Sequence, residues 1–131
     1  MSLLRIENVD IRYGQFRAVR GLSLEVAQGE VVALIGPSGC GKSTLLNMGS
    51  GLYLPTEGEV LVNGKRVAGP NPQVAFMLQK DLLLPWRTIL QNSELGLEIR
   101  GVAAQERRER AHAALTKCHL SGFENHYPHQ L

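Results

Sequence analysis

The hydrophobic pattern of the chain begins with alternation, in which apolar and polar residues take turns as they do along a half-exposed strand. This alternation covers residues 3–13 and returns over 22–26. Two further short strands, 58–62 and 65–67, flank Asn63-Gly64, the dipeptide that most favours a tight hairpin. The pattern therefore predicts antiparallel strands near the start of the chain and again near its middle.

Two other stretches are apolar without alternation. Residues 30–35 form one charge followed by an unbroken apolar run, which is typical of a strand buried on both faces of a parallel sheet. Residues 74–78 have the same character and follow the chain breaker at 69–72. We expect a strand at each place, and the first needs parallel neighbours on its edges and helices on its faces.

Helical patterns occupy much of the remainder. A helix is predicted from Ser43 to Met48, a second over 88–99, and a third from about Ala103 to Cys118. In the third, one face is predicted to carry Ala111, Ala114, Leu115 and Cys118. Strands on both sides of a strand–loop–helix unit predict an α/β fold with a small β-rich lobe.

Composition excludes several classes of protein. The 131 residues carry 14 basic and 12 acidic side chains, a net charge of +2, so no general nucleic-acid-binding surface is predicted. The mixed charges of 106–110 indicate a solvated helix face with a Glu106–Arg110 pair. No apolar run is long enough to span a bilayer, and the start of the chain lacks a signal-peptide layout. We therefore expect a cytoplasmic protein that reaches a membrane only through a partner.

The strongest chemical signal is residues 36–44, the phosphate loop, which fit the pattern G-x-x-x-x-G-K-[ST]. Its expected nucleotide-binding residues are Gly36, Ser38, Gly39, Cys40, Gly41, Lys42, Ser43 and Thr44. The glycines allow backbone turns closed to other residues, and the N–H groups that follow can converge on an anion at a helix start. Lys42 supplies a compact positive charge for the terminal phosphates, and the Ser43 hydroxyl is a ligand for Mg²⁺. This loop predicts a nucleotide triphosphate site.

Four further features resemble the ATP-binding subunits of ABC transporters. Tyr13 follows the first strand, residues 22–30 are similar to the family's lead-in to the phosphate loop, and residues 56–64 are similar to its hairpin. Gln79 ends a strand-like run, as the family's glutamine loop does. Residues 83–92 look most like the importer branch that handles nitrate, sulfonates and taurine.

The resemblance implies roles that have plainer alternatives. Tyr13 would stack on adenine, or would be a strand-end aromatic packed on the core. Gln79 would contact Mg²⁺ and orient the attacking water, or would be an ordinary polar strand end. Thr44 would help to hold the α-phosphate, or would only start the helix. Trp86, the sole tryptophan, is equally suited to core packing and to contact with a permease.

The resemblance also implies a mechanism and partners. In the family, two ATP-binding subunits sandwich ATP with Mg²⁺, and their closure drives transmembrane permease subunits supplied by a solute-binding protein. The chain would then be an ATPase subunit, most simply a homodimer, that is peripheral on the inner face of the plasma membrane. Lys42 and Gln79 would be its catalytic side chains.

The resemblance covers the chain from about Leu3 to Leu131, and residues 126–131 are similar to the lead-in to the family's signature motif. We therefore expect 1–131 to be the N-terminal part of an ABC-type domain, without the signature, the acidic metal-binding strand or the switch histidine. Alone it should bind nucleotide at most weakly, hydrolyse it negligibly, and expose apolar surface and an unpaired strand edge.

Three other functions fit the phosphate loop. The chain could be a regulatory or decoy module that binds nucleotide without turnover. A GTP-binding switch is disfavoured because no N-K-x-D motif occurs. A soluble ABC-type protein of repair or translation is disfavoured by the resemblance of Leu84-Pro85-Trp86 to transport subunits.

Overall fold

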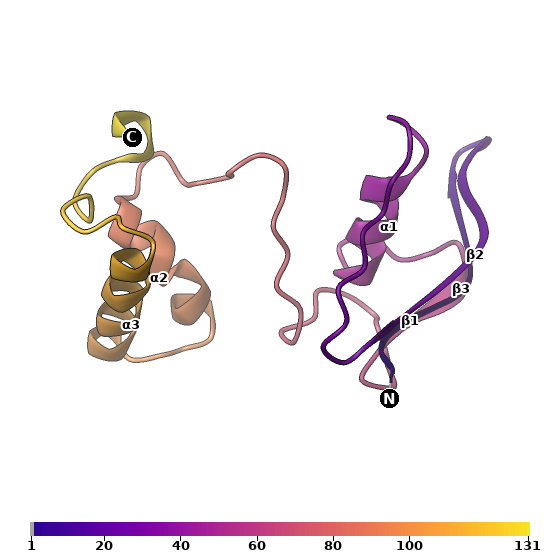
Figure 1. The fold of residues 1–131 in the computed structure, drawn as a ribbon, viewed down its shortest axis with the longest axis horizontal. Helices are drawn as coiled ribbons and strands as arrows, with labels where there is room; N and C mark the ends of the chain where they lie inside the picture. Colours follow the sequence, from indigo (N-terminus) through magenta and orange to yellow (C-terminus); the bar gives the residue numbers. More distant parts are fainter. Residues whose placement is uncertain (1) are drawn as a thin grey trace. The chain divides into compact units, whose positions relative to one another are not determined.

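The computed structural model describes residues 2–131 and divides into two compact units. One unit ends at Phe76 and holds the sheet and the first helix, and the other runs over Met77–Leu131 and is helical (Figure 1). The phosphate loop and Tyr13 belong to the first unit, whereas Gln79 and Trp86 belong to the second.

The sheet of the first unit is antiparallel, with strand order β2-β1-β3-β4. Its strands are β1 (Ser2–Tyr13), β2 (Phe16–Ala27), β3 (Glu57–Val62) and β4 (Lys65–Arg66). The predicted alternating strands and the Asn63-Gly64 hairpin are confirmed. Strand β2 begins six residues before the predicted 22–26, because register shifts along β1 and β2 interrupt the alternation that would have revealed it.

Helix α1 (Lys42–Gly49) starts directly after the phosphate loop and packs its apolar side on the sheet. Leu45 and Met48 of α1 are buried together with β1, β2 and β3 side chains that include Val9, Val19 and Val60. This core fixes the helix, and therefore the end of the loop, against the sheet.

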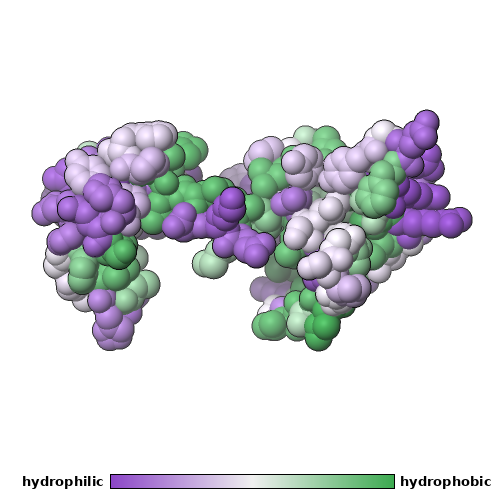
Figure 2. Space-filling model, turned by 90° about the horizontal axis from the view of Figure 1, so that it is seen from above, coloured by the Kyte–Doolittle hydropathy of each residue, from purple (hydrophilic) through white to green (hydrophobic). Residues whose placement is uncertain are grey.

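The two continuous apolar stretches do not form the predicted strands. Residues 30–35 and 74–78 run without sheet pairing in the part of the chain that the structure describes. Val31 and Ile35 are 95% and 94% exposed, and Figure 2 shows green apolar side chains open at the surface. A parallel strand is stable only when neighbours satisfy its backbone edges, and none of the described strands does so here. The expected exposure of apolar surface is found, as Met77 also shows.

The second unit is a pair of helices, α2 (Ile89–Ile99) and α3 (Ala104–Lys117), followed by the short 3₁₀ helix η1 (Pro128–Gln130). The two long helices confirm the predicted ones. The apolar face of α3 is narrower than predicted: Ala111 and Leu115 are buried, but Ala114 and Cys118 are exposed. Within this unit only one side of α3 is covered, so the stripe is limited to residues four apart.

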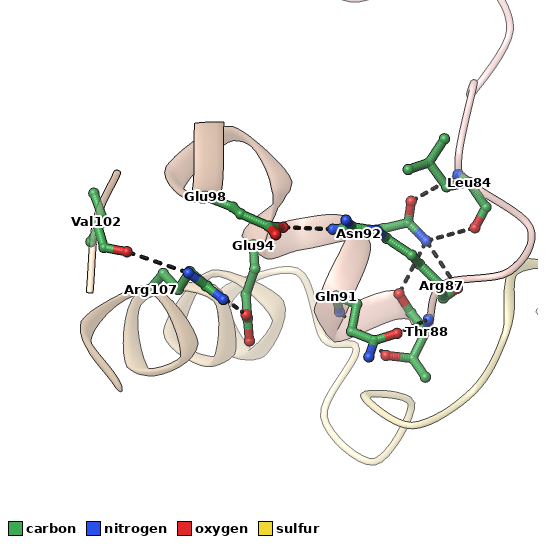
Figure 3. A network of polar contacts seen from close by, with 9 residues as sticks. All are labelled: Leu84, Arg87, Thr88, Gln91, Asn92, Glu94, Glu98, Val102 and Arg107. Carbon is green, nitrogen blue, oxygen red and sulfur yellow. Dashed lines mark hydrogen bonds and ion pairs between the residues drawn. The ribbon is translucent and has the colours of Figure 1, made fainter. Parts of the chain in front are cut away.

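Polar contacts hold the second unit together. The Thr88 side chain and Gln91 form a capping box at the start of α2. Arg107 of α3 donates to the buried Glu94 of α2 at 3.2 Å, and Arg87 donates to Glu98 at 2.7 Å (Figure 3). The predicted Glu106–Arg110 pair is confirmed at 3.4 Å. Among the described residues, no helix has the length and apolar character that crossing a membrane requires.

Candidate nucleotide-phosphate site

The phosphate loop takes the backbone shape that its glycines permit. Gly39 and Gly41 have φ angles of 81° and 100°, in the left-handed region that side chains disfavour. Gly36 has an ordinary φ, but a β-carbon there would lie 3.0 Å from Cys40 Sγ on the other side of the loop. A side chain at position 36 would therefore crowd the space next to Cys40 Sγ and Lys42 Nζ, and its absence lets the main chain approach a ligand closely.

Lys42 extends across this loop. Its Nζ donates to the carbonyl oxygens of Gly36 at 2.5 Å and Pro37 at 2.7 Å, and it lies 3.5 Å from Cys40 Sγ. These contacts place a positive charge within the curve of the loop, six residues of chain away from its entry at Gly36. An anion that enters the loop meets that charge directly.

The first turn of α1 adds backbone N–H groups that have no acceptor within the helix. Gly41 is the N-cap residue and gives no side-chain cap, and the first turn contains no acidic residue. The N–H groups of Lys42, Ser43 and Thr44 have no carbonyl partner one turn earlier in the helix, so they and the helix dipole favour a negative ligand. Ser43 is exposed and Thr44 is half-buried in this turn. These backbone donors suit a phosphate group, and the Ser43 hydroxyl suits the role of a magnesium ligand.

The end of the phosphate loop packs against strand β2. A β-carbon on Gly41 would stand 3.1 Å from the Ala18 carbonyl oxygen and 3.1 Å from Val19 Cγ2. A cavity of about 300 Å³ beside the loop is lined from both sides, by Val19 and Leu22 of β2 and by Cys40 and Lys42. Sequence reasoning missed Ala18 and Val19, because nothing in their spacing from the loop indicates that β2 passes beneath it.

Tyr13 lies at the end of β1, where its side chain is 51% exposed. This exposure does not fit the alternative of an aromatic packed on the core. Its predicted role in stacking on adenine stays a prediction.

Gln79 is exposed and belongs to the unit over Met77–Leu131. The apolar run that precedes it is not a strand in the described residues, so Gln79 does not end a strand as predicted. Its roles towards Mg²⁺ and water also stay predictions.

Trp86 is 71% exposed, which excludes the core-packing alternative within its unit. It lines a polar cleft of about 740 Å³ together with residues of α2 and α3, among them Glu94, Glu98 and Arg107. The loop that carries Trp86 is held by Asn92, whose side-chain amide donates to the carbonyl oxygens of Leu84 and Arg87 at 3.1 and 3.0 Å (Figure 3).

Asp10 is a buried carboxylate that sequence reasoning did not single out. It is 3% exposed, accepts the Gly21 backbone N–H at 2.6 Å and pairs with Arg17, while Arg12 lies 3.8 Å away. The hydrogen bond from Gly21, followed by the two arginines, lowers the pKa of Asp10 below its ordinary value of 3.8. The carboxylate thus ties the two strands of the hairpin whose tip begins at Tyr13.

Known proteins match this arrangement. The family model described as "ABC transporter" matches residues 19–131. A taurine import ATP-binding protein of Chromobacterium violaceum is 44% identical over 133 aligned residues, which cover 100% of this chain and 51% of that protein. An uncharacterised ABC transporter ATP-binding protein of Methanocaldococcus jannaschii is 42% identical over 98% of this chain and 49% of its own length. The chain spans about half the length of these curated relatives.

Solved structures agree with the sequence relatives. A dimeric bacterial ABC transporter cassette superposes with a TM-score of 0.85 at 34% identity, over 98% of this chain and 62% of that one. A dimeric post-hydrolysis ATP-binding cassette bound to ADP and Pi superposes with a TM-score of 0.84 at 33% identity, over the same shares of the two chains. The predicted fold class, an α/β nucleotide-binding fold of the ABC type, is thereby confirmed. The chain belongs to the ABC transporter family and corresponds to part of its ATP-binding cassette.

Proposed function

We propose that the chain binds ATP with Mg²⁺ through residues 36–44, as part of an ATPase subunit that powers import of a small polar solute. The observation that carries this proposal is Lys42, whose Nζ lies 2.5 and 2.7 Å from two carbonyl oxygens of the loop. Together with the donors that begin α1, it concentrates positive potential where a phosphate chain would bind.

Each residue has a separate task in this proposal. Lys42 neutralises charge on the terminal phosphates, while the backbone at Gly39 and Gly41 and the first turn of α1 donate hydrogen bonds. The Ser43 hydroxyl would hold Mg²⁺, which would supply charge stabilisation to the phosphates. Thr44 contacts the α-phosphate, Tyr13 stacks on the base, and Gln79 orients water and Mg²⁺ in the assembled transporter.

We propose that turnover by the chain alone is negligible. Transfer of a phosphoryl group to water needs an oriented nucleophile and charge stabilisation on several sides of the γ-phosphate. The cavity beside the phosphate loop is lined by Arg20, Cys40, Gly41, Lys42 and apolar residues, with no carboxylate among the lining residues. The loop therefore supplies binding and one cation, but no general base.

The proposed partners are transmembrane permease subunits, a second ATP-binding subunit and, indirectly, a solute-binding protein. Support comes from relatives named as import ATP-binding proteins and from similar cassettes that are dimeric. The exposed Trp86 and the polar cleft beside it are the proposed permease-contact surface. Such contact would place the protein on the cytoplasmic face of the plasma membrane.

The test is a titration of the purified chain with ATP and Mg²⁺, for the parent and for Lys42→Ala. Loss of a hydrogen bond to a charged group should weaken binding by roughly 1.5–3 kcal/mol. Lys65→Ala, a change at an exposed lysine of β4, is the matched control and should leave affinity unchanged. Equal ATP affinity in parent and Lys42→Ala would contradict the proposed site.

Two further measurements separate the alternatives. Titration with GTP under the same conditions tests the GTP-switch reading, which requires tighter binding of GTP than of ATP. Steady phosphate release from the chain, abolished by Lys42→Ala, would contradict negligible turnover. In the assembled transporter, binding without any turnover would favour the regulatory or decoy module.

A further inference from the structure

The tip of the β1–β2 hairpin presents two aromatic side chains directly opposite each other. Tyr13 pairs with Phe16 across a two-residue turn that begins at Gly14, whose φ of 62° suits a tight hairpin. Directly opposed residues of an antiparallel pair have their side chains on the same face, with Cβ atoms about 4.5–5.5 Å apart. The two rings, named here the aromatic pair, are therefore neighbours on one face of the hairpin.

The register shows which face this is. Ile11 pairs with Val19 and Arg12 with Arg17, so Ala18 is an extra residue on β2. Without that bulge, Tyr13 would be paired with Arg17 rather than with Phe16. Because side chains alternate along β1, the aromatic pair continues the face of Ile11 and Val19, both of which are buried in the core.

This face of the hairpin extends from the phosphate loop to the hairpin tip. Val19 is the residue whose Cγ2 would meet a β-carbon on Gly41, and Phe16 lies three residues before it on β2, at the hairpin tip. Three residues of extended chain span about 10 Å, a distance that a ribose and its phosphates can bridge. Figure 1 shows the hairpin tip and the loop before α1 at the same end of this unit.

The aromatic pair is exposed, and the neighbouring arginines lie on the other face of the hairpin. Tyr13 is 51% exposed and Phe16 is 65% exposed, and neither takes part in the ring contacts of the described chain. Arg12 and Arg17 are on the opposite face, where Asp10 binds both guanidinium groups. The face towards the loop is left apolar and aromatic, which suits a flat, uncharged purine base rather than a further phosphate.

We propose that Phe16 is a second base-contacting residue, which together with Tyr13 forms a two-ring platform for the purine of the nucleotide whose phosphates residues 36–44 bind. This inference rests on the proposed nucleotide site and adds Phe16 to it. One ring of the pair stacks on the face of the base, and the other covers its edge and excludes water.

The experiment compares two probes that share phosphates and differ in the base. Mg·ATP and Mg·tripolyphosphate are titrated against the parent chain, Phe16→Ala, Tyr13→Ala, the double variant and Lys42→Ala. Phe16→Ala should weaken ATP binding about fivefold or more and leave tripolyphosphate binding unchanged, since the lost contact is to the base alone. Phe16→Trp should restore ATP affinity, and Phe16→Leu should restore it only in part.

Glu25→Ala is the matched control, because Glu25 is exposed on the same strand and is not among the residues that line the cavity beside the phosphate loop. It should leave both affinities unchanged. Unchanged ATP affinity in Phe16→Ala, while Lys42→Ala loses binding, would overturn the platform and leave the proposed function standing. Equal weakening of both probes by Phe16→Ala would also overturn it, because the effect would then be on the loop. A parent chain that binds neither probe would overturn the proposed function itself.

Discussion

Gly41 lies so close to Ala18 that a β-carbon on the glycine would stand 3.1 Å from the Ala18 carbonyl oxygen. The phosphate loop and strand β2 thus meet almost backbone to backbone. The contact joins the residues proposed to hold phosphates to the hairpin proposed to hold the base. Two constraints therefore favour glycine at position 41. One is the close approach to β2, and the other is the φ of 100°, which disfavours a side chain.

Gly41→Ala should therefore damage both stability and nucleotide binding. We expect the unfolding free energy to fall by about 1–3 kcal/mol from backbone strain, and ATP affinity to fall with the loop's shape. Gly101→Ala is the control, since Gly101 has a φ of 74° but open space around it in the other unit. It should lower stability without changing ATP affinity. Urea unfolding and ATP titration measure the two effects. Retained ATP affinity in Gly41→Ala would contradict the close packing of Gly41 against β2.

Asp10 should make the stability of the hairpin depend on pH. Its pKa is lowered chiefly by the Gly21 N–H bond and then by Arg17, so the folded state binds this proton less readily than the unfolded state. The contribution of Asp10 is fully present above the ordinary carboxyl pKa of 3.8 and is lost as pH falls through the lowered folded-state pKa.

Asp10→Asn should flatten this acid limb of the stability curve, measured by urea unfolding between neutral pH and about pH 3. The asparagine cannot neutralise Arg12 and Arg17, so stability at neutral pH should fall as well. Glu25→Gln removes an exposed carboxylate from the neighbouring strand β2 and is expected to change neither quantity. An acid limb as steep in Asp10→Asn as in the parent would refute this account.

Two glycines at the end of α1 should respond to alanine in opposite ways. Gly49 is helical, and a β-carbon there would meet Leu4 Cδ2 at an ordinary 3.8 Å. Gly49→Ala should therefore stabilise the first unit by about 0.5–1 kcal/mol. Gly51 has a φ of 81°, and a β-carbon there would collide with the Gly69 carbonyl oxygen. Gly51→Ala should destabilise the unit, and thermal melting distinguishes the two signs. A stabilising Gly51→Ala would show that the 67–69 segment lies elsewhere.

Asn92 should control the loop that carries Trp86. Its side chain accepts the Leu84 N–H at 2.8 Å and donates to the carbonyls of Leu84 and Arg87 (Figure 3). Asn92→Ala removes the partner of the Leu84 N–H and of the Arg87 carbonyl, so the helical unit should lose about 1–3 kcal/mol of stability. The anisotropy of Trp86, the sole tryptophan, should fall as the loop loosens. Lys117→Ala, at an exposed site of α3 outside the cleft that Trp86 lines, should leave the anisotropy unchanged. Unaltered anisotropy in Asn92→Ala would show that the loop is held by other contacts.

Local patterns were sufficient for the elements whose stabilising contacts lie nearby in the chain. The hairpin depends on the turn preference of Asn63-Gly64, and helices α2 and α3 depend on hydrophobic periodicity. The Glu106–Arg110 pair joins neighbours one helical turn apart. The apolar face of α3 was overestimated at Ala114 and Cys118, because periodicity shows which residues share a stripe but not how wide a partner covers it. The stretches 30–35 and 74–78 were identified as apolar, yet whether they pair as strands depends on neighbours distant in sequence.

The sequence by itself determined the chemistry of the phosphate loop, because glycine, lysine and serine at these spacings have conformational and charge properties of their own. The family and its nucleotide chemistry were likewise readable from motifs in order. Only the tertiary structure decided that Gly41 rests on Ala18 and Val19, that Asp10 joins Arg12 and Arg17, and that Trp86 is exposed. It also brought Phe16 opposite Tyr13. These relationships depend on strand register and on one extra residue at Ala18, and a shift of one residue in pairing turns every side chain to the other face of the sheet.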